Sequence, residues 1–154
     1  MDSSKIEERC ARILRRYPRR EGGVLPLLVE FQKERGWISE DTAEEVAGLL
    51  GLPPARVWEV VSACPDLRTR PCGRHLIEVC RGLPCRLMGS EEVMSLLEER
   101  LGIAPGESSQ DGRFTLIEVD CLGACGAAPV MRVDGEVHQS LTRERIEQIL
   151  EGLR

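Results

Sequence analysis

Two short apolar runs that each lead into a pair of cysteines constrain this chain more than any other feature. The run "HLIEV" at 75–79 leads into Cys80, with Cys85 four intervening residues later. The run "FTLIEV" at 114–119 leads into Cys121, with Cys125 three intervening residues later. Both runs predict strands. If the strands are parallel, their carboxyl ends lie at one edge of the sheet and the four thiols converge there.

Four converging thiolates are the ligand set of a [2Fe-2S] cluster, with two sulfurs on each iron. The oxidised cluster carries about two negative charges, which backbone N–H groups can stabilise. Three glycines in the two loops allow the main chain to approach closely, and we expect them to support the cluster: Gly82, Gly123 and Gly126. Arg81 and Arg86 are expected to add positive charge.

Other uses of these cysteines must be weighed against the cluster. Structural zinc also takes four thiolates at spacings of two to four residues, so the spacing leaves zinc open. A dithiol oxidoreductase usually has a Cys-x-x-Cys motif, which this chain lacks. A Rieske centre needs two histidine ligands, and the only histidines, His75 and His138, lie outside both loops.

Three further cysteines bring the total to an odd seven, which together with the absence of an export signal argues against a disulfide framework. Cys10 lies on an apolar helix face and is interpreted as a core residue. Cys64 and Cys72 are interpreted as structural or exposed, with a disulfide or a ligand exchange as the alternative. His75 is interpreted as a hydrogen-bonded structural residue. Because no catalytic motif is present, we expect the chain to carry electrons without transforming a substrate itself.

Four short helices are predicted in the first 65 residues. The first begins with a capping box at Ser4 and is ended by Pro18 and the Gly22–Gly23 pair. Its apolar face consists of Ile6, Cys10, Ile13, Leu14 and Tyr17. The other three begin near Pro26, after the cap Ser39, and at Pro53-Pro54. Gly36 is expected to end the second helix and Gly51 the third.

The spacing of the apolar residues along the chain changes after a predicted linker at 64–74. An amphipathic helix is expected at 90–101, a hairpin around Asp134-Gly135, and a last helix capped by Thr142. The elements predict an α/β protein, with a helical bundle domain at 1–70 and a domain of thioredoxin type at 71–154.

Charge and hydropathy exclude several classes of protein. A net charge of -5 argues against nucleic-acid binding. The basic run at 12–20 is interpreted as a solvated helix face, with a docking patch for an acidic partner as the alternative. No apolar run approaches the roughly 18 residues of a membrane span, and no leader peptide is recognised. We expect a cytoplasmic chain without direct membrane insertion.

Longer stretches carry a resemblance to a known family. "LLVEFQKERGWIS", "HLIEVC", "GRFTLIEVDCLGACGAAPVMRV" and "LTRERIEQIL" resemble the thioredoxin-like [2Fe-2S] subunit of NADH:quinone oxidoreductase, respiratory complex I. Related subunits occur in NAD-linked hydrogenases and formate dehydrogenases. The resemblance implies an N-terminal helical bundle followed by a thioredoxin-like [2Fe-2S] ferredoxin domain. It also implies that Cys80, Cys85, Cys121 and Cys125 bind the cluster.

The resemblance further implies a partner. In this family the partner is a flavoprotein subunit that binds NADH and FMN within a larger oxidoreductase complex, and the [2Fe-2S] centre exchanges single electrons with the flavin. The complex would hold the chain at the periphery of a membrane. Residues 60–73 lack the aromatic stretch that is usual in the family, which bears on how the partner fits. A zinc-bound or metal-free docking module is the competing interpretation.

Overall fold

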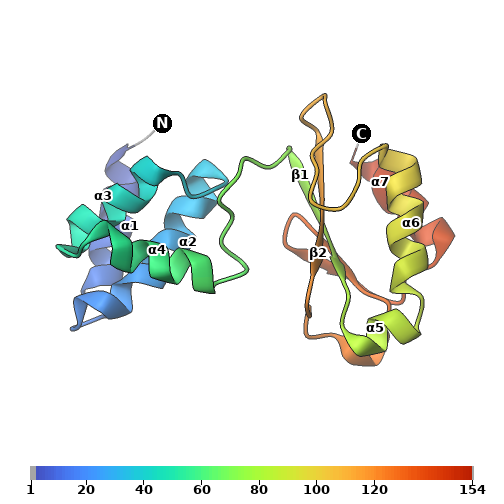
Figure 1. Cartoon of the computed structure of the whole chain (residues 1–154), viewed down its shortest axis with the longest axis horizontal. Coiled ribbons are helices and arrows are strands. Elements are labelled where there is room, and N and C mark those ends of the chain that lie inside the picture. The colour runs from blue at the N-terminus through green and yellow to red at the C-terminus, as the bar shows by residue number, and fades with distance from the viewer. Residues whose placement is uncertain (1–2, 154) are drawn as a thin grey trace. The chain divides into compact units, whose positions relative to one another are not determined.

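The computed structural model describes residues 3–153 (Figure 1). The chain divides into two compact units, Met1–Pro71 and Cys72–Arg154. The first unit is helical and the second combines a sheet with helices.

The first unit is a bundle of four helices with an aliphatic core. Its elements are α1 (Ser3–Leu14), the short 3-10 helix η1 (Arg20–Gly23), α2 (Val24–Arg35), α3 (Glu40–Leu50) and α4 (Pro54–Ala63). All four helices contribute to the core, in which Phe31 is the one fully buried aromatic side chain of the described residues, and Trp58 packs against this core partly buried. Apolar residues at helical spacing form this core because each helix buries one face against the others.

Several predicted helix ends are confirmed. The hydroxyl of Ser39 accepts a hydrogen bond from the Thr42 N–H at 3.2 Å, so Ser39 caps α3. Gly36 ends α2 with φ of 85°, and Gly51 ends α3 with φ of 62°. Glycine takes this left-handed conformation without the steric cost that a side chain would impose.

The prediction for the first helix was partly wrong. Helix α1 ends at Leu14, so Tyr17 lies beyond it and is 40% exposed instead of packing on its apolar face. Gly22 and Gly23 belong to η1, and α2 begins at Val24, before Pro26. Pro18 disfavours helical backbone in the residue before it, so the helix stops earlier than its pattern of apolar residues suggests. Helix α1 begins at Ser3, one residue before the predicted cap Ser4, whose side chain is outside the described part of the structure.

The first half of the predicted linker is part of the bundle. Leu67 is buried with the core of the first unit. The N–H of Ile38 donates to the carbonyl of Arg68 at 2.7 Å. The N–H of Arg68 donates to the Gln32 side chain at 2.6 Å. These bonds hold the segment against the helices.

The second unit is a mixed sheet with helices on one side. Its strands are β1 (His75–Cys80), β2 (Phe114–Val119), β3 (Met131–Val133) and β4 (Glu136–His138). Its helices are α5 (Leu83–Leu87), α6 (Ser90–Leu101), the 3-10 helix η2 (Cys125–Ala127) and α7 (Arg143–Gly152). Figure 1 shows α6 and α7 on the same side of the sheet.

The strand order is β2-β1-β3-β4. Strands β1 and β2 are parallel, with Cys80 opposite Val119, and the other neighbours are antiparallel. The predicted α/β fold class is confirmed. Helix α6 covers the face of the sheet that buries Ile77, Val79 and Leu116. Because side chains alternate along a strand, Glu78 and Cys80 lie on the opposite face.

The hairpin and the last helix match their predictions. Asp134 and Gly135 have φ of 50° and 91° in the turn between β3 and β4. The Asp134 carboxylate accepts the N–H of Leu76 at 2.8 Å and lies 2.7 Å from Nδ1 of His75. Thr142 caps α7, accepting the N–H of Arg145 at 3.3 Å. His75 is therefore a hydrogen-bonded structural residue, as expected.

Within residues 3–153, every helix is too short or too polar to cross a lipid bilayer.

Candidate metal centre

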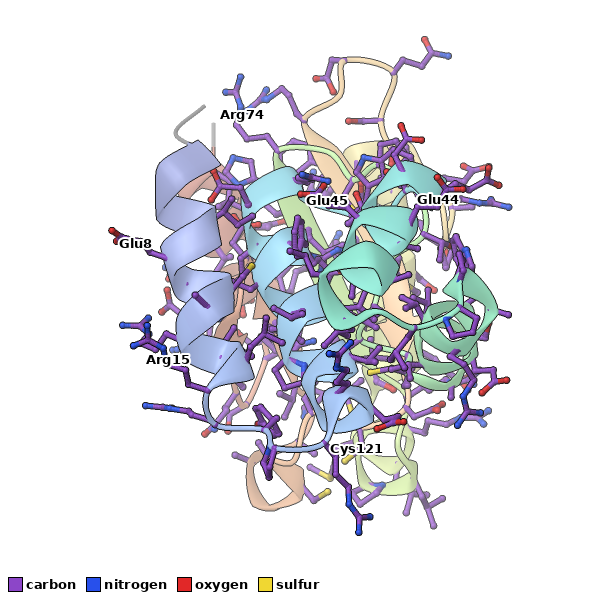
Figure 2. All side chains as sticks on the ribbon, turned by 90° about the vertical axis from the view of Figure 1, so that its left-hand side faces the viewer. Glu8, Arg15, Glu44, Glu45, Arg74 and Cys121 are labelled. Carbon is purple, nitrogen blue, oxygen red and sulfur yellow. The ribbon has the colours of Figure 1, made fainter. Side chains whose placement is uncertain are left out.

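The parallel pair β1 and β2 brings the two cysteine loops to one edge of the sheet. Cys80 is the last residue of β1, and Cys121 follows the end of β2 by two residues. Hydrogen bonds join the loops directly, since the N–H of Arg81 donates to the carbonyl of Val119 at 2.9 Å. Figure 2 shows sulfur atoms gathered beside the labelled Cys121. The two cysteine loops lie at the same edge of the sheet, as expected from parallel strands.

A short helix that sequence analysis missed positions Cys85. The segment after Cys80 was interpreted as a loop, but Leu83–Leu87 form α5. Pro84 occupies the first turn, where its missing N–H costs nothing. The N–H of Arg86 donates to the carbonyl of Gly82 at 3.0 Å, which closes the turn around Cys85. A five-residue helix is too short to show a hydrophobic period, so Pro84 was its only sequence signal.

The four thiols differ in burial. Cys80 and Cys85 are 2% and 1% exposed, whereas Cys121 and Cys125 are exposed. The pair from the first loop therefore lies on the inner side of the site. The pair from the second loop lies at the surface.

Backbone N–H groups point at the inner sulfurs and at Cys121. Burial acts to raise the pKa of Cys80, but the N–H groups of Gly82 and Leu122 and the neighbouring thiols lower that pKa below its ordinary value. Burial raises the pKa of Cys85 to about 11, and its contact with Cys80 adds to the rise. The N–H of Gly123 lies 3.3 Å from Sγ of Cys121. Such groups stabilise anionic sulfur.

The thiols form a connected set. The neighbouring thiols of Cys85 and Cys121 act on the pKa of Cys80, and the neighbouring thiol of Cys121 raises the pKa of Cys125. In the part of the chain that the structure describes, no three His, Cys, Asp or Glu side chains are grouped around one point as for a single metal ion. A [2Fe-2S] core takes four thiolates over two irons, so the chemistry of the donor set fits that group.

Two of the three predicted glycines have a structural reason to be glycine. A Cβ on Gly82 would lie 3.1 Å from the carbonyl oxygen of Asp120 and 3.5 Å from Sγ of Cys80. Gly123 has φ of 75°, which disfavours any side chain. A Cβ on Gly126 would meet no atom within 4 Å, so the protein atoms around it do not require glycine.

The two arginines of the first loop carry less free positive charge than expected. Both Nε and Nη2 of Arg81 donate to the Asp120 carboxylate, at 3.0 and 2.9 Å. Arg86 makes the same two-nitrogen contact with Glu91, at 3.1 and 2.8 Å. Asp120 is distant in sequence and Glu91 lies in the next helix. The sequence of the first loop, which contains neither, therefore suggested a net positive charge at the site.

The other three cysteines form no disulfide within residues 3–153. Cys10 is 3% exposed in the core of the first unit, as predicted, and burial raises the pKa of its thiol. Cys64 and Cys72 are half-buried, and no disulfide joins them in the described chain.

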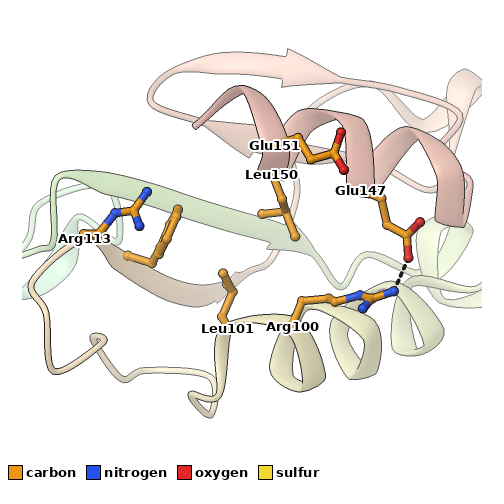
Figure 3. Close-up of a pocket in the computed structure, with 7 residues that line it drawn as sticks. Arg100, Leu101, Arg113, Glu147, Leu150 and Glu151 are labelled. Atoms are coloured by element: carbon orange, nitrogen blue, oxygen red, sulfur yellow. Dashed lines mark hydrogen bonds and ion pairs between the residues drawn. The ribbon is translucent and has the colours of Figure 1, made fainter. Parts of the chain in front are cut away.

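Cavities occur at both ends of the second unit. One of about 360 Å³ adjoins the cysteine loops and is lined by Cys80, Arg81 and residues of α6. Another, of about 340 Å³, lies between α6, α7 and the start of β2 (Figure 3). There Arg100 pairs with Glu147, and the guanidinium of Arg113 lies 5.1 Å from the centre of the Phe114 ring. That second cavity contains no cysteine.

The chain is similar to known proteins over most of its length. The model of the thioredoxin-like [2Fe-2S] ferredoxin family matches residues 10–154. NADH-quinone oxidoreductase subunit 2 of Thermus thermophilus is 42% identical over 136 residues, which are 88% of this chain and 75% of the relative. A second relative, also a subunit of an NADH-quinone oxidoreductase, comes from Rhizobium meliloti. It is 41% identical over 139 residues, which are 90% of this chain and 83% of the relative.

A solved structure supports the fold. The structure of an air-oxidised NAD⁺-reducing [NiFe]-hydrogenase matches 85% of this chain with a TM-score of 0.74 at 22% identity. This chain spans only 22% of that hydrogenase chain. The family match, with the four-thiol edge of the sheet, identifies the cofactor as a [2Fe-2S] cluster. The chain belongs to the thioredoxin-like [2Fe-2S] ferredoxin family.

Proposed function

We propose that the chain is the electron-transfer subunit of a complex I-like NADH dehydrogenase and exchanges single electrons with the FMN of an NADH-oxidising flavoprotein. The observation that carries the proposal is the convergence of four thiols at the edge of the parallel strand pair. The chain is 42% identical to a subunit of an NADH-quinone oxidoreductase and 22% identical to the matched hydrogenase chain. The higher identity favours an NADH dehydrogenase as the parent complex.

In this proposal Cys80, Cys85, Cys121 and Cys125 bind the cluster. When bound, the cluster accepts and returns one electron at a time. The chain's own contribution is to hold the four sulfurs in place and to aim N–H groups at them. Those groups, including the N–H of Gly123 at 3.3 Å from Cys121, stabilise the negative charge that reduction increases.

The two cysteine pairs differ in burial, so one side of the cluster site is closer to the protein surface than the other. Cys80 and Cys85 are covered by the protein, whereas Cys121 and Cys125 reach the surface. An electron therefore has its shortest exit through the second loop and the surface around it. We propose that the cluster domain, residues 71–154, presents this edge to the flavoprotein, with the helical domain at 1–70 completing the subunit. A cytoplasmic position at the periphery of a membrane follows from membership of such a complex.

Substitution of single cysteines tests the ligand set. Cys121→Ser is expected to change the visible and electron paramagnetic resonance spectra, because an oxygen ligand replaces a sulfur on one iron. Cys10→Ser is the matched control, since Cys10 is a buried thiol of the first unit. Unchanged spectra in Cys121→Ser would refute the ligand assignment.

Electron exchange is tested with the flavoprotein present and absent. NADH should bleach the cluster only when the flavoprotein is added, because no nucleotide-binding motif was found in the chain. Bleaching by NADH alone would contradict the proposal, as would a cluster that stays oxidised with flavoprotein and excess NADH.

A further inference from the structure

The most exposed apolar side chains of the described residues lie beside the cluster site. Leu83, Leu87 and Met88 are 70%, 77% and 61% exposed, whereas no other large apolar side chain in residues 3–153 exceeds the 46% of Leu49. All three fall within residues 83–88, called here the apolar segment. Single exposed apolar residues are common, but a contiguous group marks an interaction surface.

The cluster itself cannot cover the two leucines of the apolar segment. Cys85 lies on α5 and is 1% exposed, so its side of the helix faces the thiols. Leu83 and Leu87 are each two residues from Cys85, or about 200° around the helix axis, and four residues from one another. They therefore share the side of α5 that points away from the site, and they stay exposed when the cluster is bound.

Charged side chains lie on and beside the first cysteine loop, next to the apolar segment in the chain. Arg86 pairs with Glu91 at 2.8 Å, and Arg81 pairs with Asp120 at 2.9 Å and Glu118 at 3.8 Å. Two arginines thus meet three carboxylates, which leaves an excess of one negative charge. The cluster adds about two more when oxidised. A complementary partner needs an apolar patch ringed by an excess of Lys or Arg side chains.

The charged rim and the cluster site form one continuous face. The groove of about 360 Å³ beside α6 is lined by Arg81, Arg86, Glu91 and Glu118 together with Cys80. Arg86 lies within the apolar segment and lines this groove, so α5 borders the groove that also contains Cys80. A protein seated on the apolar segment therefore comes close to the cluster, as electron exchange requires.

We propose that the apolar segment is the contact by which the NADH-oxidising flavoprotein docks, through an apolar patch with a basic rim. This inference rests on the proposed function and specifies its partner surface. Apolar anchors at the centre of an interface carry most of its binding energy, and the charged rim sets the rate of encounter. Docking should weaken when the anchors become polar, and it should slow as salt is added.

The test uses the cluster-loaded full chain and the purified flavoprotein, with the rate of NADH-driven cluster bleaching measured at subsaturating flavoprotein. The variant Leu83→Gln/Leu87→Gln keeps residues that favour a helix and is expected to lower the second-order rate constant at least about tenfold. Its visible spectrum should match that of the unmodified chain. Leu49→Gln makes the same change at a leucine that is 46% exposed in α3, and it should leave the rate unchanged.

The outcomes separate the two proposals. If the flavoprotein fails to reduce the unmodified chain, the proposed function is refuted and the docking proposal falls with it. If it reduces the unmodified chain and the double variant at equal rates, only the docking proposal is refuted. An equal loss of rate in Leu49→Gln would also refute it, because the effect would not be specific to the segment. A third result would also refute the docking proposal: the unmodified chain is a dimer, the double variant is a monomer, and both are reduced at the same rate. The segment would then contact a second copy of the chain.

Discussion

The ion pair between Glu78 and Arg132 offers a quantitative test of how the sheet beside the cluster is held together. The two residues are directly opposite on β1 and β3. The Glu78 side chain is 7% exposed and that of Arg132 is 29% exposed. Nη2 of Arg132 lies 2.7 Å from Oε1 of Glu78, and Nε contacts the other carboxylate oxygen. The contact is bidentate, which is the strong geometry for such a pair.

Removing one partner should have unequal effects. Arg132→Met leaves a buried carboxylate without its counter-charge, which costs about 3–5 kcal/mol. Glu78→Gln leaves a guanidinium that already reaches water, so we expect a cost of about 1 kcal/mol. Replacing both, as Glu78→Leu with Arg132→Met, should be within about 1 kcal/mol of the unmodified chain because both charges of the pair are removed together.

Urea unfolding followed by circular dichroism and by cluster absorbance measures these changes in the free energy of unfolding. Both tryptophans, Trp37 and Trp58, belong to the first unit, so their fluorescence is an internal control that should not move. If Arg132→Met costs no more than Glu78→Gln, the carboxylate is not desolvated and the reasoning is refuted.

Two further predictions concern the start of the sheet and the order of thiol reactivity. In Gly73→Ala the new Cβ would lie 2.8 Å from backbone atoms of Phe114, so we expect a loss of about 1–3 kcal/mol in the second unit's free energy of unfolding, measured by thermal melting. An unchanged melting temperature would contradict that close packing. In the iron-free chain at pH 8, alkylation mapped by mass spectrometry should reach the exposed Cys121 before Cys85, whose pKa of about 11 keeps its thiol protonated. Faster modification of Cys85 would contradict the burial and pKa described here.

Much of the second unit could be predicted from the sequence because its signals are local. Each strand of the parallel pair is a mostly apolar run that leads into a cysteine, and α6 has a strong apolar period ended by Gly102. The Asp134-Gly135 pair marks the hairpin without any long-range information. Parallel pairing of β1 and β2 then places the two cysteine loops side by side, so the convergence of the thiols followed from local patterns.

The errors came from short or long-range features. Helix α5 is too short to show a period, although it positions Cys85 and carries the apolar segment. The buried position of Leu67 depends on helices far away in sequence. The positive charge of Arg81 is neutralised by Asp120, and this contact forms only when the two cysteine loops come together in the fold. None of these contacts leaves a pattern in the neighbouring residues.

The account depends most on the claim that four cysteines hold two irons. The most direct measurement is the content of iron, zinc and acid-labile sulfide per chain in anaerobically purified protein, with a visible spectrum before and after dithionite. The account predicts two irons and two sulfides per chain and a colour that dithionite bleaches. One zinc per chain with no colour, persisting after reconstitution with iron and sulfide, would contradict it and would identify the site as a structural metal centre.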